Sequence, residues 1–172
     1  MSRKIRYYTE GKADNALLSI LEVEQRMISD NGGNSGVARA MKNQQRNYHN
    51  VVIGIIDDDK GRNYHSYFSE FELIAKPDDF KLKHKPGSNQ FIIILCCPAI
   101  EMWLLNSAKS VSIIPEDYEM SSNVKIFGKT IKSINIAKNE NFMKFIRTIK
   151  HEKAESFTLL SNVLKNPFIY LQ

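Results

Sequence analysis

The apolar run at residues 51–56 (VVIGII) constrains the fold more than any other segment of this chain. An uninterrupted apolar run of this length is typical of a parallel strand buried on both faces, because a strand with one solvated face alternates polar and apolar residues. The run leads directly into the polar sequence Asp57-Asp58-Asp59-Lys60-Gly61. We therefore predict a central strand whose carboxyl end carries a cluster of acidic side chains.

Other segments predict further strands around it. Residues 5–9 (IRYYT) are β-branched and aromatic and predict a first strand, parallel to the central one. The turn sequence at residues 86–89 (PGSN) separates residues 80–85 from residues 90–96 and predicts a hairpin. We find no clear strand between residues 27 and 49.

Helices are predicted between these strands from apolar residues at helical spacing. The first helix is capped by Asp14 and places Leu17, Leu21 and Ile28 on one face. Further helices are expected after the glycine-rich loop 30–36, at residues 64–73, after Pro98, and at residues 141–150 and 155–164. Strands that alternate with helices indicate an α/β fold with a mainly parallel central sheet flanked by helices.

Composition and charge restrict the class of protein. At 172 residues the chain has the usual size of one domain, and its longest apolar run, residues 91–97, is far too short to span a bilayer. Lys and Arg number 24 against 19 Asp and Glu, and the formal net charge of +5 mildly favours phosphate-rich partners. The adjacent Cys96 and Cys97 do not form a disulfide framework, so we expect a reduced, cytoplasmic protein without membrane contact.

Acidic residues follow three of the predicted strands. Glu10 comes after the first strand, Asp57 and Asp59 come after the central strand, and Glu101 lies in the first turn of the helix after residues 91–97. Ligands of open α/β sheets bind beyond the carboxyl ends of the strands. Carboxylates that converge there repel one another unless a cation lies between them, and Mg²⁺ or Mn²⁺ suits such oxygen ligands. Because residues i and i+2 of a strand point to the same side, Asp57 and Asp59 can meet one ion while Asp58 points away.

These motifs resemble a known family. The sequence Glu10-Gly11-Lys12-Ala13-Asp14 after one strand and Asp57-x-Asp59-x-Gly61 after another resemble the TOPRIM domain of topoisomerases, primases and related nucleases. The stretch Pro98-x-x-Glu101-x-Trp103-Leu104-Leu105 is similar to a segment of compact TOPRIM-like proteins of bacterial defence and abortive infection, of the RloB-like kind. The resemblance covers about residues 5–107 and implies a TOPRIM-like Rossmannoid core over residues 1–107. Residues 108–172 are then a small helical extension packed on that core.

The resemblance also implies a function. It predicts a Mg²⁺-dependent nuclease that cleaves phosphodiester bonds in DNA or RNA, in bacterial or phage defence. Glu10, Asp57, Asp59 and Glu101 would form the catalytic site, and the first three would bind the metal. The alternative is a non-catalytic metal- or nucleic-acid-binding subunit of a larger complex, with a protein partner such as an ATPase. A phosphatase or phosphotransfer domain with an Asp57-cluster nucleophile is a weaker third hypothesis, because it leaves Glu10 unexplained.

Basic residues near these motifs are the candidate nucleic-acid contacts. They are Lys12, Lys60 and the hairpin residues Lys81, Lys83 and Lys85.

Each feature also has a simpler interpretation. The hairpin lysines form a solvated charge run, Glu10 and Glu101 are acids favoured at helix entries, and residues 57–59 form an aspartate-rich turn. Trp103 fits a core anchor better than a base-stacking platform.

Overall fold

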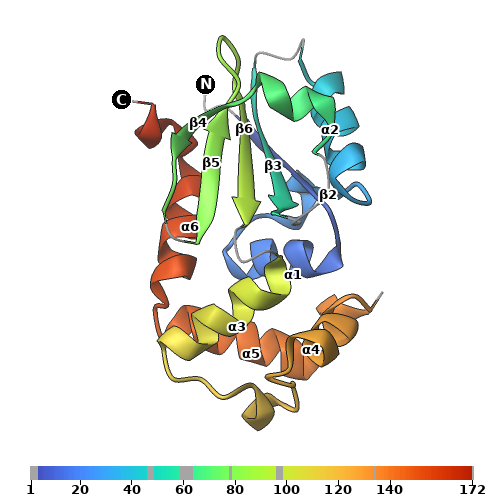
Figure 1. Cartoon of the computed structure of the whole chain (residues 1–172), viewed down its shortest axis with the longest axis vertical. Helices are drawn as coiled ribbons and strands as arrows, with labels where there is room; N and C mark the ends of the chain where they lie inside the picture. Colours follow the sequence, from blue (N-terminus) through green and yellow to red (C-terminus); the bar gives the residue numbers. More distant parts are fainter. Residues whose placement is uncertain are drawn as a thin grey trace.

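The computed structural model describes residues 4–45, 49–58, 64–77, 79–95, 99–133 and 135–171. Within these residues a six-stranded sheet forms the centre of the molecule, with the strand order β2-β1-β3-β6-β5-β4 (Figure 1). The strands are β1 Lys4–Thr9, β2 Ile28–Asp30, β3 Asn50–Asp57, β4 Glu72–Ala75, β5 Phe80–His84 and β6 Gln90–Leu95.

The sheet is mainly parallel. Strands β2, β1, β3 and β6 run in one direction, whereas β5 is antiparallel to β6 and β4 is antiparallel to β5. This arrangement confirms the α/β class and the predicted hairpin. Strand β3 lies between β1 and β6, and residues 51–56 are all buried, as their apolar run predicts. Because β1, β2, β3 and β6 are parallel, their carboxyl ends lie at the same edge of the sheet.

Strand β2 corrects the sequence analysis, which found no strand in this region. Helix α1 (Lys12–Ile20) ends well before Ile28, and Glu22 adopts a positive φ of 68° that does not continue a helix. Ile28 therefore does not lie on the helix but pairs with Tyr7 of β1. The sequence Ile28-Ser29-Asp30 is too short and too exposed to show a strand pattern, so its conformation follows from pairing with β1.

Alternate residues of β3 face two hydrophobic layers. Ile53 and Ile55 belong to the cluster that contains buried residues of α1, α3 (Ile100–Ser110) and the C-terminal helices. Val52 and Ile56 belong to the opposite cluster, with residues of α2 (Asn34–Asn43) and the 3₁₀ helix η2 (Ser66–Glu70). The chain thus covers both faces of its central strand, which is why that strand carries apolar residues at every position.

The C-terminal part of the chain packs against the first part. Helices α5 (Glu140–His151) and α6 (Glu155–Lys165) confirm the two helices expected there, and both contact α3. Trp103 of α3 is 1% exposed and stacks on Phe157 of α6 with 5.0 Å between ring centroids. The interpretation of Trp103 as a core anchor is therefore confirmed. Figure 1 shows α3, α4 and α5 beyond the arrowheads of β3 and β6.

Two further elements differ from the expectation. Helix α4 (Val124–Ile131) was not predicted, because it is short and contains a glycine in its interior. Residues 64–73 do not form one helix but contain η2 and the beginning of β4. The remaining 3₁₀ helices are η1 Gln25–Met27, η3 Pro115–Tyr118, η4 Ile136–Lys138 and η5 Pro167–Tyr170. Among the residues described, we find no helix with the length and apolar character that a bilayer crossing requires.

Candidate active site

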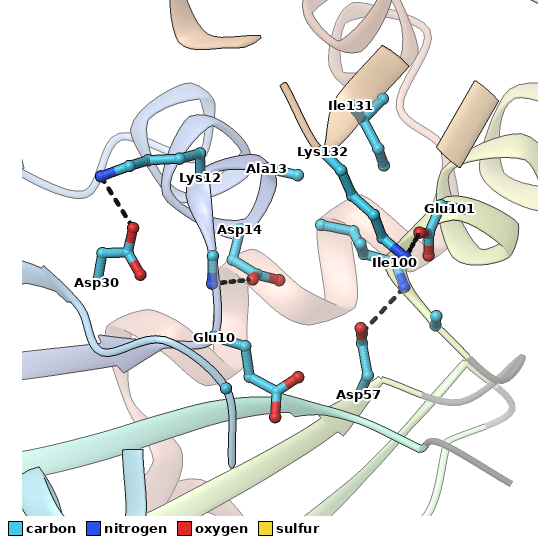
Figure 2. Close-up of a pocket in the computed structure, with 13 residues that line it drawn as sticks. Glu10, Lys12, Ala13, Asp14, Asp30, Asp57, Ile100, Glu101, Ile131 and Lys132 are labelled. Atoms are coloured by element: carbon cyan, nitrogen blue, oxygen red, sulfur yellow. Dashed lines mark hydrogen bonds and ion pairs between the residues drawn. The ribbon is translucent and has the colours of Figure 1, made fainter. Parts of the chain in front are cut away.

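A pocket of about 370 Å³ lies at the carboxyl edge of the parallel strands. Strand β1 has β2 on one side and β3 on the other, so the connections through α1 and α2 leave in opposite directions. This is the switch point at which open α/β sheets bind their ligands. The pocket is lined by Glu10, Gly11, Lys12, Ala13, Asp14, Asp30, Gly33, Asp57, Ala99, Ile100, Glu101, Ile131 and Lys132 (Figure 2).

Glu10 and Asp57 are placed by the two strands that flank the switch point. Thr9 pairs with Ile55 in the parallel register, so both chains leave the sheet side by side. Figure 2 shows the carboxylates of Glu10, Asp14 and Asp57 pointing toward one another. Asp57 Oδ1 also accepts a hydrogen bond of 3.0 Å from the backbone N–H of Ile100. This bond connects the end of β3 to the N-terminus of α3, where the helix dipole favours a negative charge.

Asp14 is a member of the pocket that the sequence analysis assigned only to helix capping. Gly11 is the N-cap residue of α1, and Asp14 lies in the first turn, where its carboxylate accepts a 3.0 Å hydrogen bond from the Gly11 N–H. Burial raises the pKa of Asp14 well above its usual range, and the charges of Asp57, Glu10 and Glu101 raise it further against the effect of the Gly11 bond. Asp14 therefore experiences the charges of the other three acids.

Glu101 is held by residues in α4 and at its C-terminal end. Its side chain is 7% exposed, and its Oε1 atom lies 2.9 Å from the Nζ atom of Lys132. Gly128 packs against the same carboxylate: a Cβ atom at that position would lie 3.2 Å from Glu101 Oε1. Sequence reasoning missed Lys132 because residues 108–172 carry no motif. The Gly128-x-x-x-Lys132 spacing becomes informative only when Glu101 is known to lie beside this helix.

Lys12 is the predicted nucleic-acid contact that lines the pocket. Its Nζ atom lies 2.9 Å from Asp30 Oδ2, at the end of β2.

The hairpin lysines lie elsewhere. Phe80 and Leu82 of β5 point into the hydrophobic layer that contains α1, α5 and α6. Because side chains alternate along a strand, Lys81 and Lys83 point to the opposite face of the sheet. The Nζ atom of Lys81 lies 2.7 Å from an oxygen of Asp58.

Lys85 contacts residues on the same side of the sheet as Lys81. Its Nζ atom lies 2.7 Å from Glu70 Oε2 and 4.6 Å from the ring centroid of Tyr67. Neither Lys85 nor the other two hairpin lysines line the pocket.

The described residues contain part of the predicted metal site. Asp59 and Lys60 lie outside the described residues, as do Cys96, Cys97 and Pro98. Within the described ranges, no group of three His, Cys, Asp or Glu residues is arranged to hold a metal ion. Glu10 and Asp57 nevertheless supply carboxylate oxygens, and Mg²⁺ is commonly held by one or two carboxylates with several waters. Burial is the main cause of the raised pKa of Asp14, and repulsion from the neighbouring acids adds to it. A cation would relieve that repulsion, so the donor set fits a hard divalent ion.

The structure thus brings Glu10, Asp57, Glu101 and Lys12 to one pocket and leaves the hairpin lysines outside it. Comparisons of the chain with family models, curated proteins and solved structures found no match. The proposed function therefore depends on this pocket and on the sequence motifs that form it.

Proposed function

We propose that this protein is a TOPRIM-like, Mg²⁺- or Mn²⁺-dependent nuclease that hydrolyses phosphodiester bonds of DNA or RNA in bacterial or phage defence. The observation that supports it best is the convergence of Glu10, Asp57 and Glu101 on one pocket at the strand switch point. The defence setting follows from the sequence resemblance alone.

The residues of the pocket have distinct chemical tasks in this proposal. Glu10 and Asp57 would hold the divalent cation, which when bound polarises the phosphoryl group and promotes ionisation of water. Glu10 would serve either as a ligand or as the base that accepts a proton from the attacking water. Asp57 keeps its orientation through the hydrogen bond from the Ile100 N–H. No tyrosine is assigned as a nucleophile, so hydrolysis is favoured over strand transfer.

The pocket also has features that attract phosphate. Its lining includes the first residues of α1 and the N-cap residues of α2 and α3, Gly33 and Ala99. Helix N-termini carry partial positive charge and unpaired backbone N–H groups, which favour anions. Lys12, which is paired with Asp30, places an ammonium group on one side of the carboxylates of Glu10, Asp14 and Asp57 (Figure 2). An acidic centre surrounded by positive groups suits a phosphate substrate that arrives together with a cation.

The test is a cleavage assay on end-labelled single-stranded and duplex DNA and RNA, with Mg²⁺, Mn²⁺ or a chelator. We expect cleavage by the wild type with metal, and its loss with the chelator or with Glu10→Gln. Glu72→Gln is the matched control, because Glu72 is an exposed acid on β4 outside the pocket. Wild-type protein that binds nucleic acid but cleaves none of these substrates would instead support the binding-subunit alternative. Normal cleavage by Glu10→Gln would refute the site.

A further inference from the structure

The two partners of the Glu101–Lys132 ion pair differ in their exposure to solvent. The side chain of Glu101 is 7% exposed, whereas that of Lys132 is 75% exposed. Glu101 is therefore fixed within the protein, and the long side chain of Lys132 reaches it from the solvent side of the pocket. A buried carboxylate can in this way hold a solvated cation at a defined place.

The packing of helix α4 allows the contact between Lys132 and Glu101. Gly128 lies on α4, and Lys132, four residues later, is the C-cap residue of the helix, so the two lie on the same side. The absence of a side chain at Gly128 lets the helix approach Glu101, since an added Cβ atom would lie 3.2 Å from both the Cγ and Oε1 atoms. Ile131, which is 1% exposed, fixes the end of the helix in the core beside the pocket. The position of the Lys132 side chain at the pocket therefore follows from the packing of α4.

The charges of the pocket lining indicate what Lys132 could bind. The cationic side chains of the described lining are Lys12 and Lys132, against the acids Glu10, Asp14, Asp30, Asp57 and Glu101. Figure 2 shows Lys12 and Lys132 on opposite sides of the carboxylates of Glu10, Asp14 and Asp57. A phosphate that approaches Glu10 and Asp57 is repelled by them, and cations placed on both sides reduce that repulsion.

We propose that Lys132 contacts a phosphate of the substrate and that Glu101 is the positioning residue that holds it there. This inference rests on the proposed nuclease function and gives Glu101 a role through Lys132 instead of through the metal. It also makes α4, in the C-terminal third of the chain, one wall of the substrate site. The substrate is recognised here by its charge and not by its bases, because a lysine ammonium contacts phosphate as a point charge.

Binding of a fluorescein-labelled oligonucleotide, measured at several salt concentrations, tests the inference without requiring cleavage. We expect Lys132→Gln to weaken binding about two- to fivefold, the range of a solvated ion pair. The slope of log affinity against log salt should flatten by about one, as for the loss of one phosphate contact. Lys129→Gln is the matched control, because Lys129 is an exposed lysine in the last turn of α4, outside the pocket. It should leave both quantities unchanged, and Lys132→Arg should restore the wild-type slope.

A double-mutant cycle tests the role of Glu101. Whatever change in binding Glu101→Gln produces should shrink when Lys132→Gln is already present, whereas the effect of Glu10→Gln should be the same in both backgrounds. Thermal denaturation of each variant shows whether it is folded at the assay temperature.

The outcomes separate the inference from the proposed function. If Lys132→Gln and Lys129→Gln bind alike, Lys132 is no phosphate contact, while the cleavage assay still decides the function. If the wild type binds in a Lys132-dependent way but cleaves nothing, the nuclease proposal fails and the contact stands. If the oligonucleotide does not bind at all, the inference is overturned.

Discussion

Asp57 combines two tasks in this structure, and two substitutions separate them. Its Oδ1 atom accepts the Ile100 N–H hydrogen bond at the start of α3, and its charge faces the other acids of the pocket. Asp57→Asn keeps an oxygen acceptor of the same shape but removes the charge. Asp57→Ala removes both. The comparison of the two variants therefore isolates the hydrogen bond, and the comparison of Asp57→Asn with the wild type isolates the charge.

The expected free energies follow from these contacts. Loss of a side-chain acceptor at a helix N-terminus costs about 1 kcal/mol, so Asp57→Ala should unfold about 1 kcal/mol more easily than Asp57→Asn. Removal of the charge forfeits about 0.3–1 kcal/mol of interaction with the helix dipole. It also relieves the repulsion between Asp57 and the buried Asp14, which acts in the opposite direction. Asp57→Asn should therefore be close to the wild type in stability.

Urea denaturation followed by the fluorescence of Trp103, the single tryptophan of the chain, measures both stabilities. The cleavage assay measures the second task. If Asp57 helps to hold the divalent cation, both variants should lose cleavage by at least about tenfold, although their stabilities differ. Equal destabilisation by Asn and Ala would refute the role of the Ile100 bond. Cleavage at the wild-type rate by Asp57→Asn would refute the assignment of the site.

Three further predictions concern stability. Because the folded-state pKa of Asp14 is raised above 3.8, the protonated form stabilises the fold. The contribution of Asp14 to the free energy of unfolding should fall from about pH 4 upward by at most about 1.4 kcal/mol per pH unit, so in urea denaturation the stability of the wild type relative to Asp14→Asn should fall over this range. Gly36→Ala places a Cβ atom 1.6 Å from the Asn31 carbonyl oxygen, so circular dichroism melting should show a loss above about 2 kcal/mol or no folded protein. Tyr7→Phe removes a 2.9 Å hydrogen bond to the Leu164 carbonyl, which should cost about 1 kcal/mol at pH 8. Since burial raises the pKa of Tyr7 to about 12, the wild type should lose this advantage as the pH rises from 10 to 12, as denaturation at pH 8 and 11 would show.

Local sequence patterns were sufficient to predict the central strand, the hairpin and the last two helices of this protein. The apolar run at residues 51–56 has no stable place except a strand covered on both faces, and β3 occupies that place. The hairpin of β5 and β6 follows from its turn residues, and α5 and α6 follow from apolar residues at helical spacing. Because parallel strands end at one edge, the positions of Glu10 and Asp57 directly after β1 and β3 were enough to predict their proximity.

Contacts between distant segments decided the rest. Strand β2 is too short to show an alternation of polar and apolar residues. It forms because its backbone N–H and C=O groups pair with those of β1. The raised pKa of Asp14 depends on burial and on the charges of Asp57 and Glu101, which lie far from it in the sequence, as well as on the nearby Glu10. Lys81 faces Asp58 and lies outside the pocket, because the sheet places its side chain on the opposite face. Lys132 reaches Glu101 only through the packing of α4 on α3, an interaction between residues that no local pattern relates.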